Sequence, residues 1–60
     1  MNEYINKNVV IELKNSNKYF GVVKEVTEYK NGLIFISITD KNNKLITFQF
    51  GEIVRIEELR

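Results

Sequence analysis

The chain lacks cysteine, histidine, tryptophan and proline. Without cysteine, a small scaffold held together by disulfides is excluded. Without histidine or cysteine, the usual zinc ligands and the commonest catalytic bases and nucleophiles are missing. We therefore expect no metal, no cofactor and no catalytic residue, and we predict that the protein is not an enzyme.

Glycine is scarce and long apolar runs are missing. Only three glycines occur, so no glycine-rich phosphate loop is present. The longest apolar run has four residues, too few to span a bilayer. The N-terminal stretch MNEYINKN has acidic and amide side chains where a signal peptide needs an apolar segment. We expect a soluble, cytoplasmic protein with no membrane partner.

The chain also lacks a large excess of either positive or negative charge. Nine basic residues face eight acidic ones, the net charge is +1, and both halves of the chain are nearly balanced. Strong non-specific binding to duplex nucleic acid needs many phosphate contacts, so this balance argues against it. It argues equally against a single-stranded DNA or chromatin-type binder.

Valine and isoleucine dominate the aliphatic residues, and alanine is absent. β-Branched side chains favour strands over helices. Val9, Ile11 and Leu13 are apolar residues at every second position, a spacing that places them on one face of a strand. The 60 residues are enough for one domain, spanning 1–60, with a small core.

A glycine interrupts the longest predicted strand, residues 19–29. Gly21 follows Tyr19-Phe20 and precedes Val22-Val23. A glycine inside a strand often marks a bend or a close approach of another backbone. We predict that this strand bends sharply and that Gly21 removes the side chain that would collide inside the bend; a glycine that is merely tolerated is the alternative.

Polar turns separate five predicted strands. Asn31-Gly32 between two apolar segments predicts a tight hairpin, with Asn31 in left-handed backbone. Turns are also expected over residues 14–18, 40–44 and 51–52, and a short helical turn over residues 2–5. We predict an all-β fold, a five-stranded, strongly bent antiparallel barrel. The predicted core residues are Ile11, Leu13, Val23, Ile36, Phe48 and Ile56.

Two segments resemble a known family. The stretch YINKNVVIELKNSNKYFGVVKEV resembles the first signature of Sm-like proteins, with Tyr19, Gly21 and Val23 on its aromatic-x-Gly-x-aliphatic pattern. The stretch LITFQFGEIVRI is similar to the second signature, where a fourth strand meets a fifth through a tight turn. The resemblance implies an SH3-like or Sm-like barrel that binds single-stranded RNA. It also implies self-association into rings, in which the fourth strand of one subunit pairs with the fifth of the next.

The resemblance also implies an RNA-binding site. Its positions in this chain are Thr27, Tyr29, Lys30, Asn31, Gln49 and Gly51. Tyr29 would stack on a base and Asn31 would read a base edge, as in single-strand recognition generally. The chain departs from the family pattern at two positions, because Thr27 replaces an aspartate and Gln49-Phe50-Gly51 replaces an Arg-Gly pair.

Several of these side chains also have a structural explanation that requires no RNA. Asn31 also fits as a residue of an Asn-Gly turn, and Tyr29 as an aromatic at the barrel edge. Phe48 and Phe50 fit the core or a subunit interface better than a stacking platform. The competing function is a small SH3-like barrel that acts as a protein-interaction or regulatory module, binding a partner by strand addition and no nucleic acid.

Overall fold

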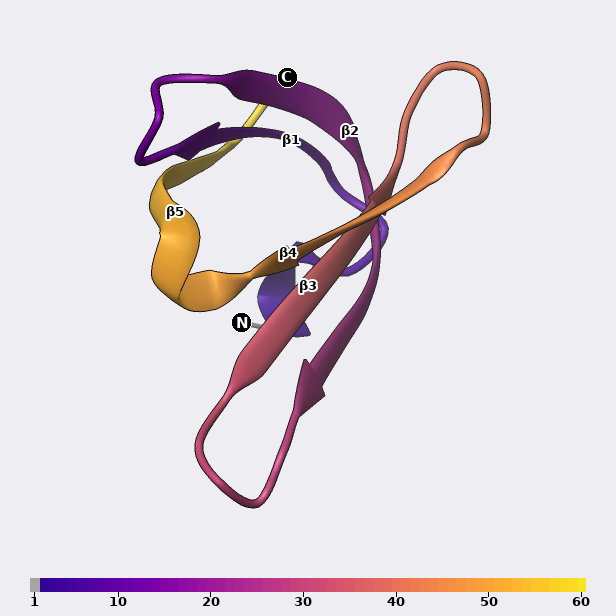
Figure 1. The fold of residues 1–60 in the computed structure, drawn as a ribbon. Coiled ribbons are helices and arrows are strands. Elements are labelled where there is room, and N and C mark those ends of the chain that lie inside the picture. The colour runs from indigo at the N-terminus through magenta and orange to yellow at the C-terminus, as the bar shows by residue number, and fades with distance from the viewer. Residues whose placement is uncertain (1) are drawn as a thin grey trace.

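The computed structural model describes residues 2–60 and has five antiparallel strands in one sheet. The elements are η1 (Asn2–Tyr4), β1 (Asn8–Leu13), β2 (Lys18–Glu28), β3 (Ile34–Thr39), β4 (Leu45–Gln49), η2 (Phe50–Glu52) and β5 (Ile53–Glu58), where η marks a 3-10 turn. The strand order is β4-β3-β2-β1-β5 (Figure 1). The predicted all-β fold is confirmed. None of the helical turns in residues 2–60 has the length and apolar character needed to cross a membrane.

Strand β2 serves both halves of the sheet. Its first half pairs with β1, where Val9 lies opposite Gly21, and its second half pairs with β3, where Val26 lies opposite Ile36. Figure 1 shows β2 curving between the two partners. An eleven-residue strand can do this only by bending, which agrees with the prediction from its length.

Gly21 lies where β2 crosses close to the end of β3. A Cβ at Gly21 would overlap the carbonyl oxygen of Thr39, and it would lie 3.0 Å from the carbonyl carbon and 3.1 Å from Cδ1 of Ile38. The obstacle is mainly backbone, which moves far less readily than the end of a side chain. The absence of a side chain at Gly21 is therefore a requirement of the bend.

A bulge follows the bend. The pairing of β2 with β3 shifts register between Val23 and Glu25, so that Lys24 is the extra residue. A bulge increases the local twist and redirects side chains. It turns β2 away from β1 and leaves Lys24 exposed on the outer surface.

The sheet bends into a barrel-like shape but is not closed by hydrogen bonds. Among residues 2–60, strand β4 pairs only with β3, and β5 pairs only with β1. The two edges are connected through η2, as Figure 1 shows. Both β4 and β5 therefore keep one side of their backbone unpaired with another strand.

The core lies inside the bend. Its buried cluster consists of Val9, Ile11, Val23, Ile36, Ile38 and Phe48. Four of the six predicted core residues belong to it, namely Ile11, Val23, Ile36 and Phe48. Alternation in β1 and β3 identified the inner faces correctly.

Leu13 and Ile56 are only partly buried at the rim of the core, contrary to the prediction. Ile56 lies on an edge strand, which has a neighbour on one side only. Leu13 lies where the β1–β5 pairing shifts register, at the end of β1. Val9 and Ile38 take the central positions because the strands around them have neighbours on both sides.

The N-terminal segment covers one end of the core. Tyr4 and Ile5 pack against the buried cluster, and the N–H of Asn6 donates to the carbonyl of Val23 at 2.8 Å. Asn6 has left-handed backbone with φ 67°, which turns the chain from η1 into β1. The expected helical turn over residues 2–5 is thus present as the 3-10 turn Asn2–Tyr4.

Three hairpin turns have the same backbone geometry. Each has Lys-Asn at its centre, followed by a residue in left-handed backbone: Ser16 (φ 74°), Gly32 (φ 88°) or Asn43 (φ 65°). In each turn, that residue donates its N–H to the carbonyl three positions earlier, at 2.9 Å. This is the three-residue hairpin loop built on a type I turn. The expectation that Asn31 is left-handed is wrong, because Gly32 alone takes that conformation in its turn.

Candidate functional site

The predicted site residues lie at one end of the sheet, on two segments that are distant in sequence. Thr27 is in the last part of β2, whereas Tyr29, Lys30 and Asn31 lie in the β2–β3 turn. Gln49 ends β4, and Gly51 lies in η2. Their convergence follows from the β3–β4 pairing, because Phe35 at the start of β3 lies opposite Gln49.

A small cavity of about 230 Å³ separates the two segments. It is lined by Gly32, Leu33, Ile34, Gln49, Phe50 and Gly51, and is called the tip cavity below. Of the predicted site residues, Gln49 and Gly51 line it, whereas Thr27, Tyr29, Lys30 and Asn31 do not, although Gly32 of the same turn does. The structure therefore brings together the turn after the second strand and the fourth–fifth connection.

Tyr29 is available for stacking. Its residue surface is 53% exposed, and its ring contacts Phe35 nearly at right angles, with ring centroids 5.5 Å apart. An edge-to-face contact of this kind orients a ring without enclosing it. Thr27 lies opposite Phe35 in the register, so Phe35 stands between Thr27 and Gln49 across the strands.

Asn31 has a structural role in its turn. Its Oδ1 accepts the backbone N–H of Leu33 at 3.1 Å. Asn15 does the same for Asn17 in the β1–β2 turn, at 3.0 Å. The carbonyl end of Asn31 is thus engaged in holding the turn, and its exposed amide nitrogen is the part left for a ligand.

Lys30 is exposed at the tip of the hairpin. The ion pairs within residues 2–60 lie elsewhere, where Lys7 pairs with Glu58 at 3.7 Å and Arg55 pairs with Glu12 at 3.3 Å and Glu57 at 2.8 Å. The Arg55–Glu12 and Lys7–Glu58 pairs connect β5 to β1 and to the segment before it, whereas the Arg55–Glu57 pair lies within β5. Lys30 makes no such pair within the described residues, so its charge is available to an anion.

The tip cavity also contains residues that the sequence reasoning did not assign. Leu33 and Phe50 line it and are exposed, although Phe50 was expected in the core or an interface. Phe48, by contrast, is buried and contacts Tyr19 with ring centroids 5.0 Å apart. The signal that separates them is the 3-10 turn, which begins at Phe50 and breaks the alternation of β4.

No known protein family, curated protein or solved structure matches this chain. The Sm-like resemblance therefore stays an expectation carried by the two signatures in the sequence. Within residues 2–60, no group of three or more His, Cys, Asp and Glu side chains gathers as a metal site would require.

Proposed function

We propose that this protein is an Sm-like, non-catalytic RNA-binding module that binds single-stranded RNA beside the tip cavity and assembles into homo-oligomers. The observation that carries the proposal is the meeting of the β2–β3 turn with the β4–η2 connection around one cavity. An exposed aromatic ring, an unpaired lysine and two amide side chains lie on these segments. That combination suits a base and its phosphate.

Each side chain has a distinct role in this proposal. Tyr29 stacks on a base, because it is exposed and its ring is oriented by Phe35. Lys30 contacts a phosphate. The amide groups of Asn31 and Gln49 hydrogen-bond to base edges, Asn31 through its Nδ2 because its Oδ1 is already bonded to Leu33.

The edge strands support self-association. Unpaired edges attract further strands unless they are protected. Leu45 on β4 is 58% exposed and Val54 on β5 is 57% exposed. Pairing β4 of one subunit with β5 of the next would cover both edges, and a repeated head-to-tail contact of this kind closes into a ring when the rotation allows it. A ring presents several sites to one RNA strand, so that avidity compensates for weak single sites.

The direct test measures fluorescence anisotropy with labelled U-rich and A-rich RNA of about 15 nucleotides. Tyr29→Ala should weaken binding by about 1–3 kcal/mol per occupied site, because a stacked base loses its platform. Tyr29→Phe keeps the ring and should bind nearly as tightly as wild type. Equal RNA affinities for wild type and both variants would show that Tyr29 does not contact the RNA.

Lys30 has a matched control in Lys14, which takes the same position in a turn of the same geometry. Lys30→Gln should reduce the dependence of log Kd on log salt concentration by about one phosphate contact. Lys14→Gln changes the net charge equally at another turn and should leave the slope unchanged. Identical slopes for the two variants would show that only net charge matters.

Asn31→Asp retains the oxygen that accepts the Leu33 N–H and removes the amide donor. Asn15→Asp makes the same change in the β1–β2 turn. If Asn31 reads a base edge, its variant should lose affinity while the Asn15 variant binds like wild type, with both melting temperatures close to that of wild type.

A second candidate function is supported by the same edges. An extended peptide could add to β4, whose outer side pairs with no other strand in the described part of the chain, and the protein would then be an interaction module. Light scattering after size exclusion separates the two. A multiple of the 7.1 kDa chain mass together with RNA binding supports the oligomeric RNA-binding module. A monomer that binds neither U-rich nor A-rich RNA at low salt supports the interaction module.

A further inference from the structure

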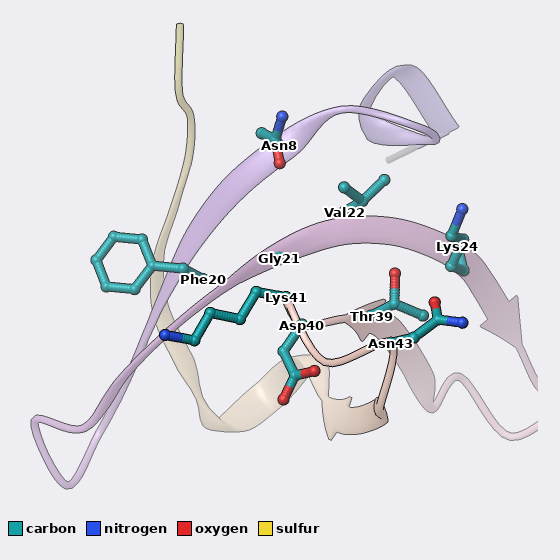
Figure 2. Close-up of a pocket in the computed structure, with 9 residues that line it drawn as sticks. All are labelled: Asn8, Phe20, Gly21, Val22, Lys24, Thr39, Asp40, Lys41 and Asn43. Atoms are coloured by element: carbon teal, nitrogen blue, oxygen red, sulfur yellow. The ribbon is translucent and has the colours of Figure 1, made fainter.

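A larger groove lies at the bend of β2, away from the tip cavity. Figure 2 shows its lining residues, which come from the start of β1, from β2, from the end of β3 and from the β3–β4 turn. They are Asn8, Phe20, Gly21, Val22, Lys24, Thr39, Asp40, Lys41 and Asn43. The volume is about 430 Å³, which is within the range of small-ligand sites. It is called the bend groove below.

The bend groove has an excess of positive charge. Lys24 and Lys41 line it, and neither forms an ion pair with another of residues 2–60. Asp40 is the acidic residue among its lining, and its Oδ1 already accepts the backbone N–H groups of Asn42 at 2.8 Å and Lys44 at 3.0 Å. The charged side chains of the lining therefore have a net charge of +1, with two lysine cations and one carboxylate that is held by the turn backbone.

Phe20 is the exposed aromatic of the groove. It is 59% exposed, because the strand alternation directs Gly21 inward and Phe20 outward. Phe20, Asp40 and Lys41 also line a neighbouring hollow of about 500 Å³, together with Tyr19, Asn42 and Ile46. Figure 2 shows the Lys41 side chain extending from the β3–β4 turn toward the side of Phe20. An aromatic face and an ammonium group are thus presented to the same space.

We infer that the bend groove is a second contact surface for single-stranded RNA, an inference that rests on the proposed function. Phe20 stacks on a base, Lys41 contacts a phosphate next to it, and Lys24, at the other end of the groove in Figure 2, contacts a phosphate farther along the strand. The exposed amides of Asn8 and Asn43 supply hydrogen bonds to sugar and base. Stacking together with cations is the combination that single-stranded nucleic acid recognises, with little demand for a particular sequence.

The position of the groove indicates how one RNA strand uses both surfaces. The β2–β3 and β3–β4 turns lie at opposite ends of β3, which has six residues. At about 3.3 Å per residue, the two turns are separated by about 20 Å. A strand of several nucleotides can span this distance, so affinity should rise steeply once the RNA is long enough to reach both surfaces.

Phe20 also lies opposite Val10, which is almost fully buried although it faces away from the core cluster. Removing the whole side chain would expose Val10 and disturb the strand pair. Phe20→Leu is therefore the better test, because leucine keeps an apolar cover and lacks the flat ring. Its melting temperature serves as the check on folding.

The experiment measures RNA affinity for wild type, Phe20→Leu, Lys41→Gln and the matched control Lys14→Gln, with A-rich RNA of about 5 and about 20 nucleotides. Phe20→Leu should weaken binding of the longer RNA about tenfold. Lys41→Gln should reduce the salt dependence by about one phosphate contact, whereas Lys14→Gln should not. Combining Phe20→Leu with Tyr29→Ala should multiply the two losses on the longer RNA.

The outcomes separate this inference from the proposed function. If Phe20→Leu and Lys41→Gln bind the longer RNA as wild type does while Tyr29→Ala weakens it, the bend groove is not an RNA surface and the tip site stands. The reverse pattern places binding in the groove and removes the tip site. Should wild type bind neither RNA, both proposals fail. Amide NMR shifts at Phe20, Gly21 and Lys41 caused by a poly-glutamate peptide but not by RNA would also overturn the inference, in favour of an acidic protein partner.

Discussion

Turns of the same geometry precede and follow β3, but the two ends of the strand differ in how tightly they are packed. At the Thr39 end, Ile38 is fully buried and the backbone of Gly21 lies against the Thr39 carbonyl. At the Ile34 end, Tyr29 and Leu33 are exposed, and nothing lies within 4 Å of a Cβ added to Gly32, although the turns at both ends extend outward in Figure 1. The tight end holds the bend, whereas the open end has freedom to contact a ligand.

The comparison shows that a local motif does not decide what a substitution costs. Lys-Asn-Gly at the open end and Lys-Asn-Asn at the tight end form the same turn. What differs is the packing that each end makes with the bend. Substitutions at the three glycines and at Asn43 test this difference, with the largest effect expected at Gly21.

Gly21→Ala, at the tight end, should destabilise the fold by about 2–3 kcal/mol, because the new Cβ overlaps a backbone carbonyl that has to move. Chemical denaturation of purified protein measures the free energy of unfolding. A variant that unfolds at the wild-type denaturant concentration would show that the bend does not depend on this contact.

Gly32→Ala, at the open end, should destabilise by about 1 kcal/mol. Nothing lies within 4 Å of its added Cβ, so the cost comes only from holding alanine at φ 88°. The loss is partly offset because alanine restricts the unfolded chain. A loss as large as that of Gly21→Ala would mean that the open end is packed as tightly as the other.

Asn43→Gly, in the turn at the tight end, should stabilise by about 0.5 kcal/mol. Asn43 has a φ of 65°, which glycine adopts without strain, although glycine also raises the entropy of the unfolded chain. Thermal and chemical unfolding should both shift upward. A clear destabilisation would indicate that the Asn43 side chain makes contacts that matter more than the backbone strain.

Gly51→Ala should change stability by no more than about 0.5 kcal/mol. Its added Cβ has nothing within 4 Å, and its φ is not in the left-handed range. This variant is the control for the series, since it adds the same methyl group without either penalty. Gly51 also lines the tip cavity, so reduced RNA binding by Gly51→Ala with unchanged stability would indicate that RNA contacts this part of the cavity.

At the candidate site, the sequence predicted the segments better than the side-chain environment. The sequence predicted turns after the second and fourth strands, and the structure brings these two segments to one cavity, whereas their role in RNA binding stays a prediction. The contact of Tyr29 with Phe35 and the exposure of Phe50 were not predicted. Both depend on the pairing of β3 with its neighbours and on the 3-10 turn, which no local pattern in the chain encodes.

The bend groove was missed for the same reason. Phe20, Lys24 and Lys41 are far apart in sequence, and no motif connects them. They share one surface because β2 bends at Gly21 and bulges at Lys24, and because the β3–β4 turn lines the same groove.

The amino-acid sequence alone determined the strands, the turns and most of the core, because alternation, β-branching and the Asn- and Gly-containing turns act between residues that are close along the chain. The tertiary structure alone decided that the sheet stays open between β4 and β5, that Leu13 and Ile56 lie at the rim, and that the tip cavity and the bend groove form at the ends of β3. These features depend on contacts between residues distant in sequence. Their positions are set by how much a strand bends and which strands become edges, and those properties belong to the assembled sheet rather than to any segment of it.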